Sequence, residues 1–350
     1  MAWRRSRWCP WLLAALPFLA GCTLPPIGGN GNDGSHGGTG GDGALPTHTQ
    51  AQIQQVWQTL KPVEGLARYD EEPRWTAPFA TGRVNREFAE QGVRFANFAR
   101  YLCGLPYDVE LDDDLMDLAQ HGAVLLAAVN QLTHTPSKPS DMGQSFYDKG
   151  YQSTSSSNLF YGVGADFSAA DAVRAFLSDN DPGNILWLGH RRWVLNPPMR
   201  KTAFGVCNGY MAMQVFDTSR TPEVSWSRML WPCEGNMPAE VFSQGDPWSV
   251  VVSTDRYDNT RTSDIAVTVE RTSDSASWTL TPEDNDPAGT YMAVDTHGYA
   301  TPFCIIFRPA DLTWAPGDTF RVTVTGLVPK VADADDTLEY ETTFFSLGDS

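Results

Sequence analysis

The residues of this chain best suited to chemistry are two histidines, His134 and His190, and one acid between them, Asp179. Imidazole titrates near neutral pH and is a common zinc ligand. If the fold brings both rings and the carboxylate together, they form a three-ligand metal site completed by water, or a site for proton transfer. The sequence favours the alternative, in which both histidines are hydrogen-bonded scaffold residues, because such networks are common.

Residues on either side of His190 are open to two interpretations. Arg191 and Arg192 could bind an anionic ligand, but ion pairs with the chain's many acids are favoured. Trp187 and Trp193 could line a groove, but burial in the core is the usual fate of tryptophan.

Other well-known catalytic patterns are absent from the sequence. It contains no His-Glu-x-x-His motif, no Gly-x-Ser-x-Gly turn and no phosphate-binding or dinucleotide-binding glycine pattern. The serine-rich run 153–157 is typical of a mobile loop, and no nucleophile is expected there.

The N-terminus has the features of an export signal. Three arginines (residues 4, 5 and 7) precede a short apolar run at 11–19, which ends at Leu19-Ala20-Gly21-Cys22. This run is too short for a membrane span. Small residues directly before Cys22 favour a lipoprotein signal peptide (1–21) over an ordinary one. We therefore predict an exported chain, acylated at Cys22 and followed by a glycine-rich tether (22–45). Anchoring to a bacterial membrane follows, with the outer membrane or cell surface favoured.

Charge and cysteine content narrow the possible partners. The chain has 42 acidic and 25 basic residues, a formal net charge of −17, which disfavours nucleic acid as a partner. Four of its six cysteines follow the tether: Cys103, Cys207, Cys233 and Cys304. An even number in an exported chain predicts two disulfides. Of three possible pairings, Cys103–Cys207 and Cys233–Cys304 are favoured, because each would lie within one expected domain.

Helical periodicity dominates the part of the chain before residue 222. A short helix is expected at 53–60, within an N-terminal extension covering 46–82, and a longer one at 86–102. The clearest helix covers 115–132 after three aspartates. Another begins after Ser168, where Asp171 completes a capping pattern. Strands at 202–206 and 211–216 flank an Asn208-Gly209 turn.

After residue 222 the pattern changes to short strands separated by Gly, Pro, Asp and Asn. This change indicates a second domain, 222–350, built as a β-sandwich of the immunoglobulin-like kind. The strand-like runs are 250–252, 265–269, 305–307, 320–324 and 342–345.

Between residues 83 and 221, the order of several motifs resembles the CAP superfamily, the group of cysteine-rich secretory proteins, antigen 5 and pathogenesis-related 1. The matching features are Ala119-Gln120, His134, Asn158-Leu159, the 172–179 helix, Gly189-His190 and Phe204-Gly205-Val206. The resemblance implies an α-β-α sandwich with these residues lining a cleft. The expected fold class is therefore α+β, a CAP domain followed by a β-sandwich.

The resemblance also implies which residues line the cleft. His134 and His190 take the places of the two family histidines, and Asp179 that of one acid, one methylene shorter than glutamate. Ser157, before Asn158, stands where the second acid is usual. A serine hydroxyl is a poor metal ligand and cannot act as a carboxylate base near neutral pH.

Three hypotheses about function follow. The favoured one is a non-catalytic, lipid-anchored protein whose His134/His190 cleft binds or displays a lipid, peptide or other envelope component. The second is a hydrolase of envelope peptide or ester bonds that uses zinc at His134 and His190, with Asp179 orienting water. The third is a structural adhesion protein in which the β-sandwich makes the contacts.

Overall fold

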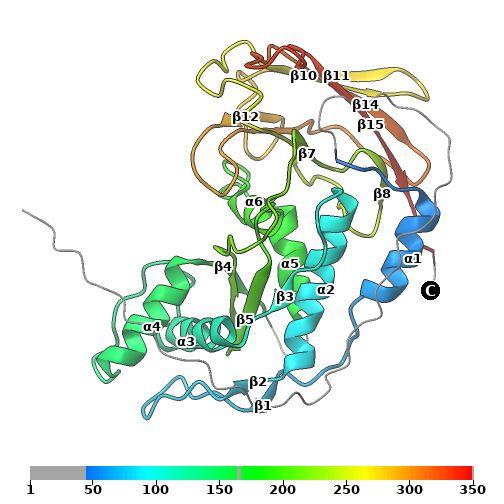
Figure 1. The fold of residues 1–350 in the computed structure, drawn as a ribbon. Coiled ribbons are helices and arrows are strands. Elements are labelled where there is room, and N and C mark those ends of the chain that lie inside the picture. The colour runs from blue at the N-terminus through cyan, green and yellow to red at the C-terminus, as the bar shows by residue number, and fades with distance from the viewer. Residues whose placement is uncertain (1–44, 164–166, 349–350) are drawn as a thin grey trace, which may run out of the picture. The chain divides into compact units, whose positions relative to one another are not determined.

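A four-stranded sheet with helices packed against it forms the first part of the protein (Figure 1). The computed structural model describes residues 45–163 and 167–348, so Cys22, the expected leader and nearly all of the tether lie outside it. The helices are α1 (Gln50–Leu60), α2 (Arg86–Leu102), α3 (Asp113–Val129), α4 (Gln144–Ser155), α5 (Ala169–Ser178) and α6 (Gly189–Val194).

The sheet runs in the order β3-β5-β6-β4. Its strands are β3 (Glu110–Leu111), β5 (Lys201–Cys207), β6 (Tyr210–Gln214) and β4 (Ser157–Tyr161). Strands β5 and β6 form the expected hairpin, with Asn208 and Gly209 at positive φ in the turn. A small two-stranded sheet, β1 (Tyr69–Glu71) with β2 (Arg83–Val84), precedes it.

Phe204 and Gly205, two neighbouring residues of β5, show how the helices cover this sheet. A Cβ added to Gly92 of α2 would meet the ring of Phe204, whereas one added to Gly205 would meet the backbone of Ala119 in α3. Successive side chains of a strand point to opposite faces. Helices α2 and α3 therefore lie on opposite faces of β5, and the missing side chains of Gly92 and Gly205 allow the close approach.

The helices begin at residues whose capping hydrogen bonds can be recognised from the sequence. Ser168 and Asp171 form the predicted capping box of α5, each side chain bonded to the other's backbone N–H. The Asp112 carboxylate accepts from two amides at the start of α3. Helix α2 spans the predicted residues. Helix α3 ends at Val129, three residues before the predicted end at residue 132, because its C-cap Asn130 adopts the left-handed conformation.

The second part of the chain contains two further sheets. One has the order β11-β10-β14-β15-β8 and the other β12-β13-β9-β7. Their strands are β7 (Arg228–Trp231), β8 (Gly235–Pro238), β9 (Trp248–Val252), β10 (Ala266–Arg271), β11 (Ala276–Leu280), β12 (Tyr291–Asp295), β13 (Cys304–Arg308), β14 (Thr319–Thr325) and β15 (Leu338–Phe345). All pairings in the two sheets are antiparallel except that of β8 with β15.

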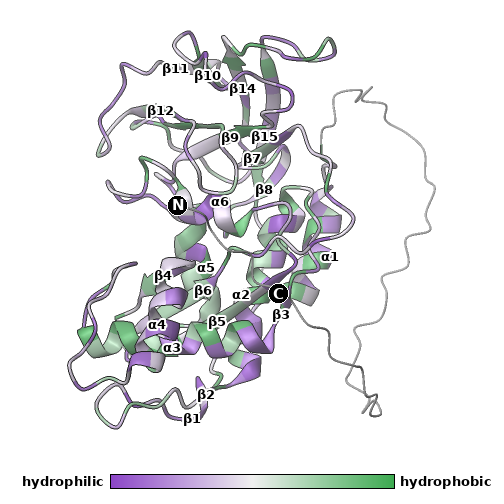
Figure 2. Ribbon diagram, turned by 60° about the vertical axis from the view of Figure 1, so that its left-hand side comes forward, coloured by the Kyte–Doolittle hydropathy of each residue, from purple (hydrophilic) through white to green (hydrophobic). Residues whose placement is uncertain are grey.

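Aromatic side chains join these two sheets. The Trp248 ring of β9 lies 5.7 Å from the Phe320 ring of β14 and 6.0 Å from the Phe344 ring of β15. All three side chains are buried. In Figure 2, hydrophobic and hydrophilic residues mix along β14 and β15, as expected of strands in which alternate residues are buried. The protein is thus of mixed α+β class with a β-rich second part, and both parts belong to one compact unit.

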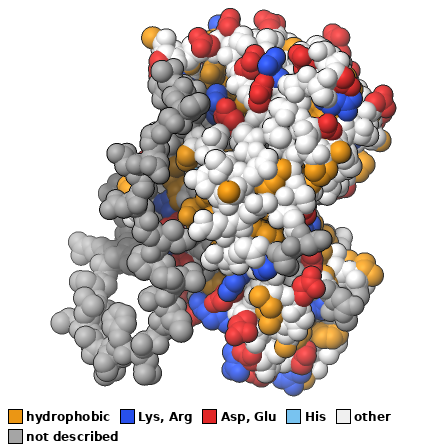
Figure 3. Space-filling model, turned by 90° about the vertical axis from the view of Figure 1, so that its right-hand side faces the viewer, with side chains coloured by type: hydrophobic (Ala, Val, Ile, Leu, Met, Phe, Trp, Pro, Cys, Tyr) orange, Lys and Arg blue, Asp and Glu red, His pale blue; other side chains and the backbone are white. Residues whose placement is uncertain are grey.

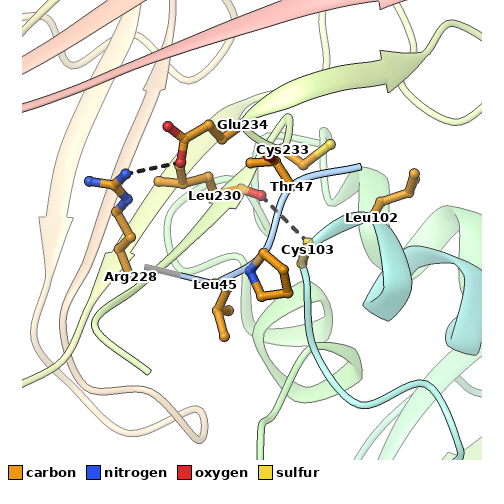
Figure 4. Close-up of a pocket in the computed structure, with 9 residues that line it drawn as sticks. Leu45, Thr47, Leu102, Cys103, Arg228, Leu230, Cys233 and Glu234 are labelled. Atoms are coloured by element: carbon orange, nitrogen blue, oxygen red, sulfur yellow. Dashed lines mark hydrogen bonds and ion pairs between the residues drawn. The ribbon is translucent and has the colours of Figure 1, made fainter. Parts of the chain in front are cut away.

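The expected disulfides do not form. Cys103, Cys207, Cys233 and Cys304 are all buried free thiols. Cys103, at the end of α2, lines a cavity of about 20 Å³ together with Cys233 (Figure 4), and its Sγ lies 3.5 Å from the Leu230 carbonyl oxygen. Cys207 packs in a different hydrophobic cluster. The favoured pairing was wrong because tertiary contact, rather than domain membership, decides which cysteines are neighbours.

The surface carries the acidic excess of the composition. Figure 3 shows charged side chains, many of them Asp and Glu, toward the two ends of the face it presents, with mainly uncharged and hydrophobic side chains between them. Of the helices in the described ranges, none has the length and apolar character that a membrane crossing needs.

The contact between Gly205 and α3 gives a direct test of the layered packing. We expect Gly205→Ala to lower the free energy of unfolding by about 3 kcal/mol, since a new Cβ would lie 2.2 Å from the Ala119 carbonyl and backbone cannot move aside easily. Urea unfolding of the purified chain measures this. Gly298→Ala, where a Cβ meets nothing within 4 Å, is the matched control and should change stability by less than about 0.5 kcal/mol.

Candidate functional site

His190 and Asp179 form a hydrogen-bonded pair where α5 ends and α6 begins. The imidazole Nδ1 lies 2.7 Å from Asp179 Oδ1. The Asp179 side chain is 1% exposed, whereas that of His190 is 20% exposed. The Phe176 ring of α5 packs beside the imidazole, with ring centroids 5.2 Å apart. The structure therefore brings Asp179 and His190 together, which the sequence left open, and Phe176 lies beside them.

Backbone conformation places the pair. Asp179 is the C-cap of α5 in the left-handed conformation (φ 45°), which Asp and Asn tolerate better than most residues. Its second oxygen, Oδ2, accepts from the backbone N–H of Arg191, 3.1 Å away. Asn158 of β4 donates from its side chain to the His190 carbonyl, 3.0 Å away. The acid and the histidine are thus each fixed by α5, α6 and β4 together.

Two opposing effects set the pKa of His190. Burial lowers it, because the charged imidazolium loses water, and the hydrogen bond and negative charge of Asp179 raise it. The second effect is the greater in sum, so the pKa lies above the ordinary value of 6.5. A partly exposed imidazole held by a buried carboxylate can donate a hydrogen bond, or a proton, from Nε2.

His134 is held by other partners, in the segment that follows α3. Its Nδ1 lies 2.7 Å from the carbonyl oxygen of Thr154, and the Thr154 hydroxyl donates back to the His134 carbonyl. Within residues 45–163 and 167–348, no three His, Cys, Asp or Glu side chains are grouped so that they could hold a metal ion. The hypothesis of a zinc site made by His134, His190 and Asp179 is therefore not supported by the arrangement of these side chains.

Ser157 is a buried structural residue, contrary to the expectation of a mobile serine-rich loop. Ser153 to Ser155 form the end of α4, and Ser157 begins β4. The Ser157 hydroxyl donates to the Ser153 carbonyl, and it accepts from the side chain of Gln214, with both distances 2.8 Å. An uncharged hydrogen-bond network thus occupies the position at which the resemblance would place a second acid. The serine run was misread because it follows a helix that periodicity did not reveal.

The arginines after His190 are buried, and they join α6 to the second part of the chain. Arg191 donates to the carbonyls of Leu177, Ser178 and Pro247 and to the Ser249 hydroxyl. Arg192 forms an ion pair with Asp295, and both side chains are at most 2% exposed. The prediction of an ion pair is confirmed for Arg192. Arg191 instead satisfies its charge mainly with carbonyl oxygens.

Two features of this region were missed or misjudged from the sequence. Arg100 of α2 is buried and donates to the carbonyl oxygen of Val194, the last residue of α6, and to carbonyls of the segment between α6 and β5. Burial lowers its pKa to about 9. Trp187, expected in the core, is 40% exposed. Trp193, the other tryptophan near His190 in the sequence, is partly buried, and its ring centroid lies 4.2 Å from that of Phe216.

No protein-family model, curated protein or solved structure matches this chain.

The His190–Asp179 pair predicts a pH dependence of stability. Because the folded pKa of His190 is raised, its contribution is fully present below the unfolded pKa near 6.5 and is lost as pH rises through the folded value. Asp179→Asn should lower the pKa of His190 and remove this component. An NMR titration of the labelled imidazoles measures the change. Asp117→Asn, which alters the equivalent partner of His121, should leave the His190 titration unchanged.

The Arg192–Asp295 pair predicts a large loss of stability when one partner is removed. Arg192→Leu leaves Asp295 buried without its cation, so we expect the free energy of unfolding to fall by about 3–5 kcal/mol. The double variant with Asp295→Leu should recover only part of this loss, because the carbonyls that Arg192 satisfied stay unpaired. Urea unfolding of the parent chain, of Arg192→Leu and of the double variant measures these changes. An Arg192→Leu variant as stable as the parent contradicts the structural role.

Proposed function

We propose that this chain is an exported, lipid-anchored CAP-domain protein that binds a lipid, peptide or other envelope component at the His190 site without catalysis. The motif order in residues 83–221 and the layering of α2 and α3 on opposite faces of β5 support the family assignment. The two contacting sheets of the second part support an immunoglobulin-like module. The basic, then apolar, segment ending at Cys22 supports export and anchoring.

The observation that carries the proposal is the His190–Asp179 pair. Asp179 uses one oxygen for the imidazole and the other for the Arg191 amide, so its negative charge is fully engaged. Nδ1 of His190 is likewise engaged, which leaves Nε2 for a ligand. A histidine with a raised pKa donates well to a carbonyl, carboxylate or phosphate oxygen. Such acceptors occur in lipid head groups and in peptides.

Three features support binding rather than hydrolysis. The second carboxylate of the family pattern is absent, and Ser157 in its place is tied into bonds with Ser153 and Gln214. His134 uses Nδ1 for the Thr154 carbonyl. No three metal-ligating side chains converge among the described residues. A metal-assisted attack on a peptide or ester bond needs such a group to activate water.

Native mass spectrometry of the full chain, made with its own leader and extracted from bacterial membranes, tests the proposal. We expect a mass that fits acylation at Cys22 and a co-purified species that is reduced at least tenfold by His190→Ala. His121→Ala, which removes another acid-paired histidine, is the matched control and should retain the species. Zinc content is measured on the same samples.

Two results would contradict the proposed binding site, and a third would contradict the lipid anchor. One zinc per chain, lost in both His134→Ala and His190→Ala, would favour the hydrolase. A bound species that survives His190→Ala in a folded protein would place the ligand elsewhere. An unacylated Cys22 in the mature chain would remove the lipid anchor but leave the binding site untouched.

A further inference from the structure

Three rings gather on the surface next to the N-terminal end of α6. Trp187 is 40% exposed and Tyr299 is 37% exposed, and their centroids lie 6.3 Å apart with the ring planes inclined at 31°. The His297 ring meets Trp187 edge-on at 5.9 Å, and its side chain is 76% exposed. Large aromatic side chains are costly to leave in water, so a group of them on the surface calls for an explanation.

One buried guanidinium holds the backbone beneath all three rings. Arg192 donates to the carbonyls of Trp187, His297 and Gly298, at 3.0, 3.0 and 2.7 Å. It also lies over the Tyr299 ring, 5.3 Å from the centroid. Its counter-ion Asp295 bonds with its other oxygen to His297 Nδ1, 2.8 Å away. The rings are therefore fixed by the interior of the protein rather than carried on a free loop.

The backbone around the rings is held in uncommon conformations. Leu188, Tyr299 and Ala300 all have positive φ values, which are unfavourable for residues other than glycine. Tyr299 packs directly on Gly189, where a Cβ would lie 2.8 Å from the Tyr299 ring. Strain of this kind persists where the surroundings enforce it, and it concentrates at functional sites.

The charge and the exposed groups of this surface indicate the class of ligand that it fits. The charge of Arg192 is neutralised by Asp295, so the surface offers no unpaired buried cation to an anionic ligand, and the chain is acidic overall. What the surface does offer is the exposed parts of the Trp187 and Tyr299 rings, for contact with apolar C–H groups, and an imidazole that can bond hydroxyl groups. We propose that Trp187, His297 and Tyr299 form a binding site for an uncharged sugar chain, separate from the His190 site.

A sugar chain fits these groups better than a protein surface does. The C–H face of a pyranose ring is flat and apolar, whereas its rim carries hydroxyl groups, which matches two inclined rings beside a polar edge. His297 Nδ1 is occupied by Asp295, so Nε2 meets the sugar hydroxyl. The site does not need the His190–Asp179 pair, so its test is independent of the proposed function.

Isothermal titration of the full chain with chitohexaose, a neutral β-1,4-linked oligosaccharide, tests the proposal, and laminarihexaose and maltohexaose extend it to other neutral linkages. We expect saturable binding to at least one of the three. Trp187→Ala and Tyr299→Ala should each weaken it about tenfold, Trp187→Phe should restore most of the affinity, and His297→Ala should weaken it about threefold. Trp75→Ala, which removes another exposed tryptophan, is the matched control and should leave affinity unchanged.

Each outcome of the titrations either supports or contradicts the sugar site. Binding lost in Trp187→Ala and kept in both Trp75→Ala and His190→Ala establishes the sugar site. Absence of binding to all three oligosaccharides overturns it, as does binding that Trp187→Ala leaves intact. Capture of a protein partner through the same rings, with no sugar affinity, would also overturn it. A circular dichroism melt shows whether each variant is folded.

Discussion

The need to satisfy two adjacent buried guanidinium groups constrains most of this structure. A buried arginine is tolerated only when nearly all of its donors have partners. Successive residues of a helix point about 100° apart, so Arg191 and Arg192 leave α6 in different directions. Arg191 reaches the end of α5 and the start of β9, whereas Arg192 reaches Asp295 and the loop between β12 and β13. The short helix α6 thereby ties the helical part to the β-rich part.

This arrangement positions the candidate site as a consequence of the packing. The Arg191 backbone amide donates to Asp179, and the Arg191 side chain donates to the last carbonyls of α5. The end of α5 and the start of α6 are therefore held together before any ligand arrives. Because the backbone on both sides of His190 is held by these bonds, His190 has little freedom to move away from Asp179. The same helix turn supports Trp187, so both surfaces depend on one buried scaffold.

Local patterns predicted the elements with clear periodicity or capping signals, missed others such as α4, α6 and β7, and predicted contacts between distant residues poorly. Ser168 with Asp171 and the aspartates before α3 signal helix starts by hydrogen bonds that span a few residues, so the sequence reveals them. The thiol of Cys103 meets the strand that precedes Cys233, which no spacing rule could indicate. The exposure of Trp187 escaped prediction for the same reason. It depends on Arg192 holding the Trp187 carbonyl and on residues over a hundred positions away.

The same difference between local patterns and contacts of distant residues applies to the site residues. Asp179 and His190 are eleven residues apart, and a helix end followed by a turn brings them together, so the sequence could raise this contact as a possibility. His134 lies far from them in the chain, and its hydrogen bonds go to Thr154. Ser157 looked like a loop residue because α4 lacks an apolar stripe that would reveal it. Its buried bonds with Gln214 depend on the register of β4 with β6, in which Ser157 pairs with Gln214.

The shortness of Asp179 now has a physical explanation. An aspartate reaches one methylene less far than the glutamate that the CAP resemblance implies at this position. Asp179 compensates through its backbone, because the left-handed C-cap conformation turns the chain and directs the short side chain toward the next helix. There its two oxygens meet the His190 ring and the Arg191 amide at the same time. An aspartate at this position is long enough to make both bonds. The shorter acid therefore suffices at this helix junction.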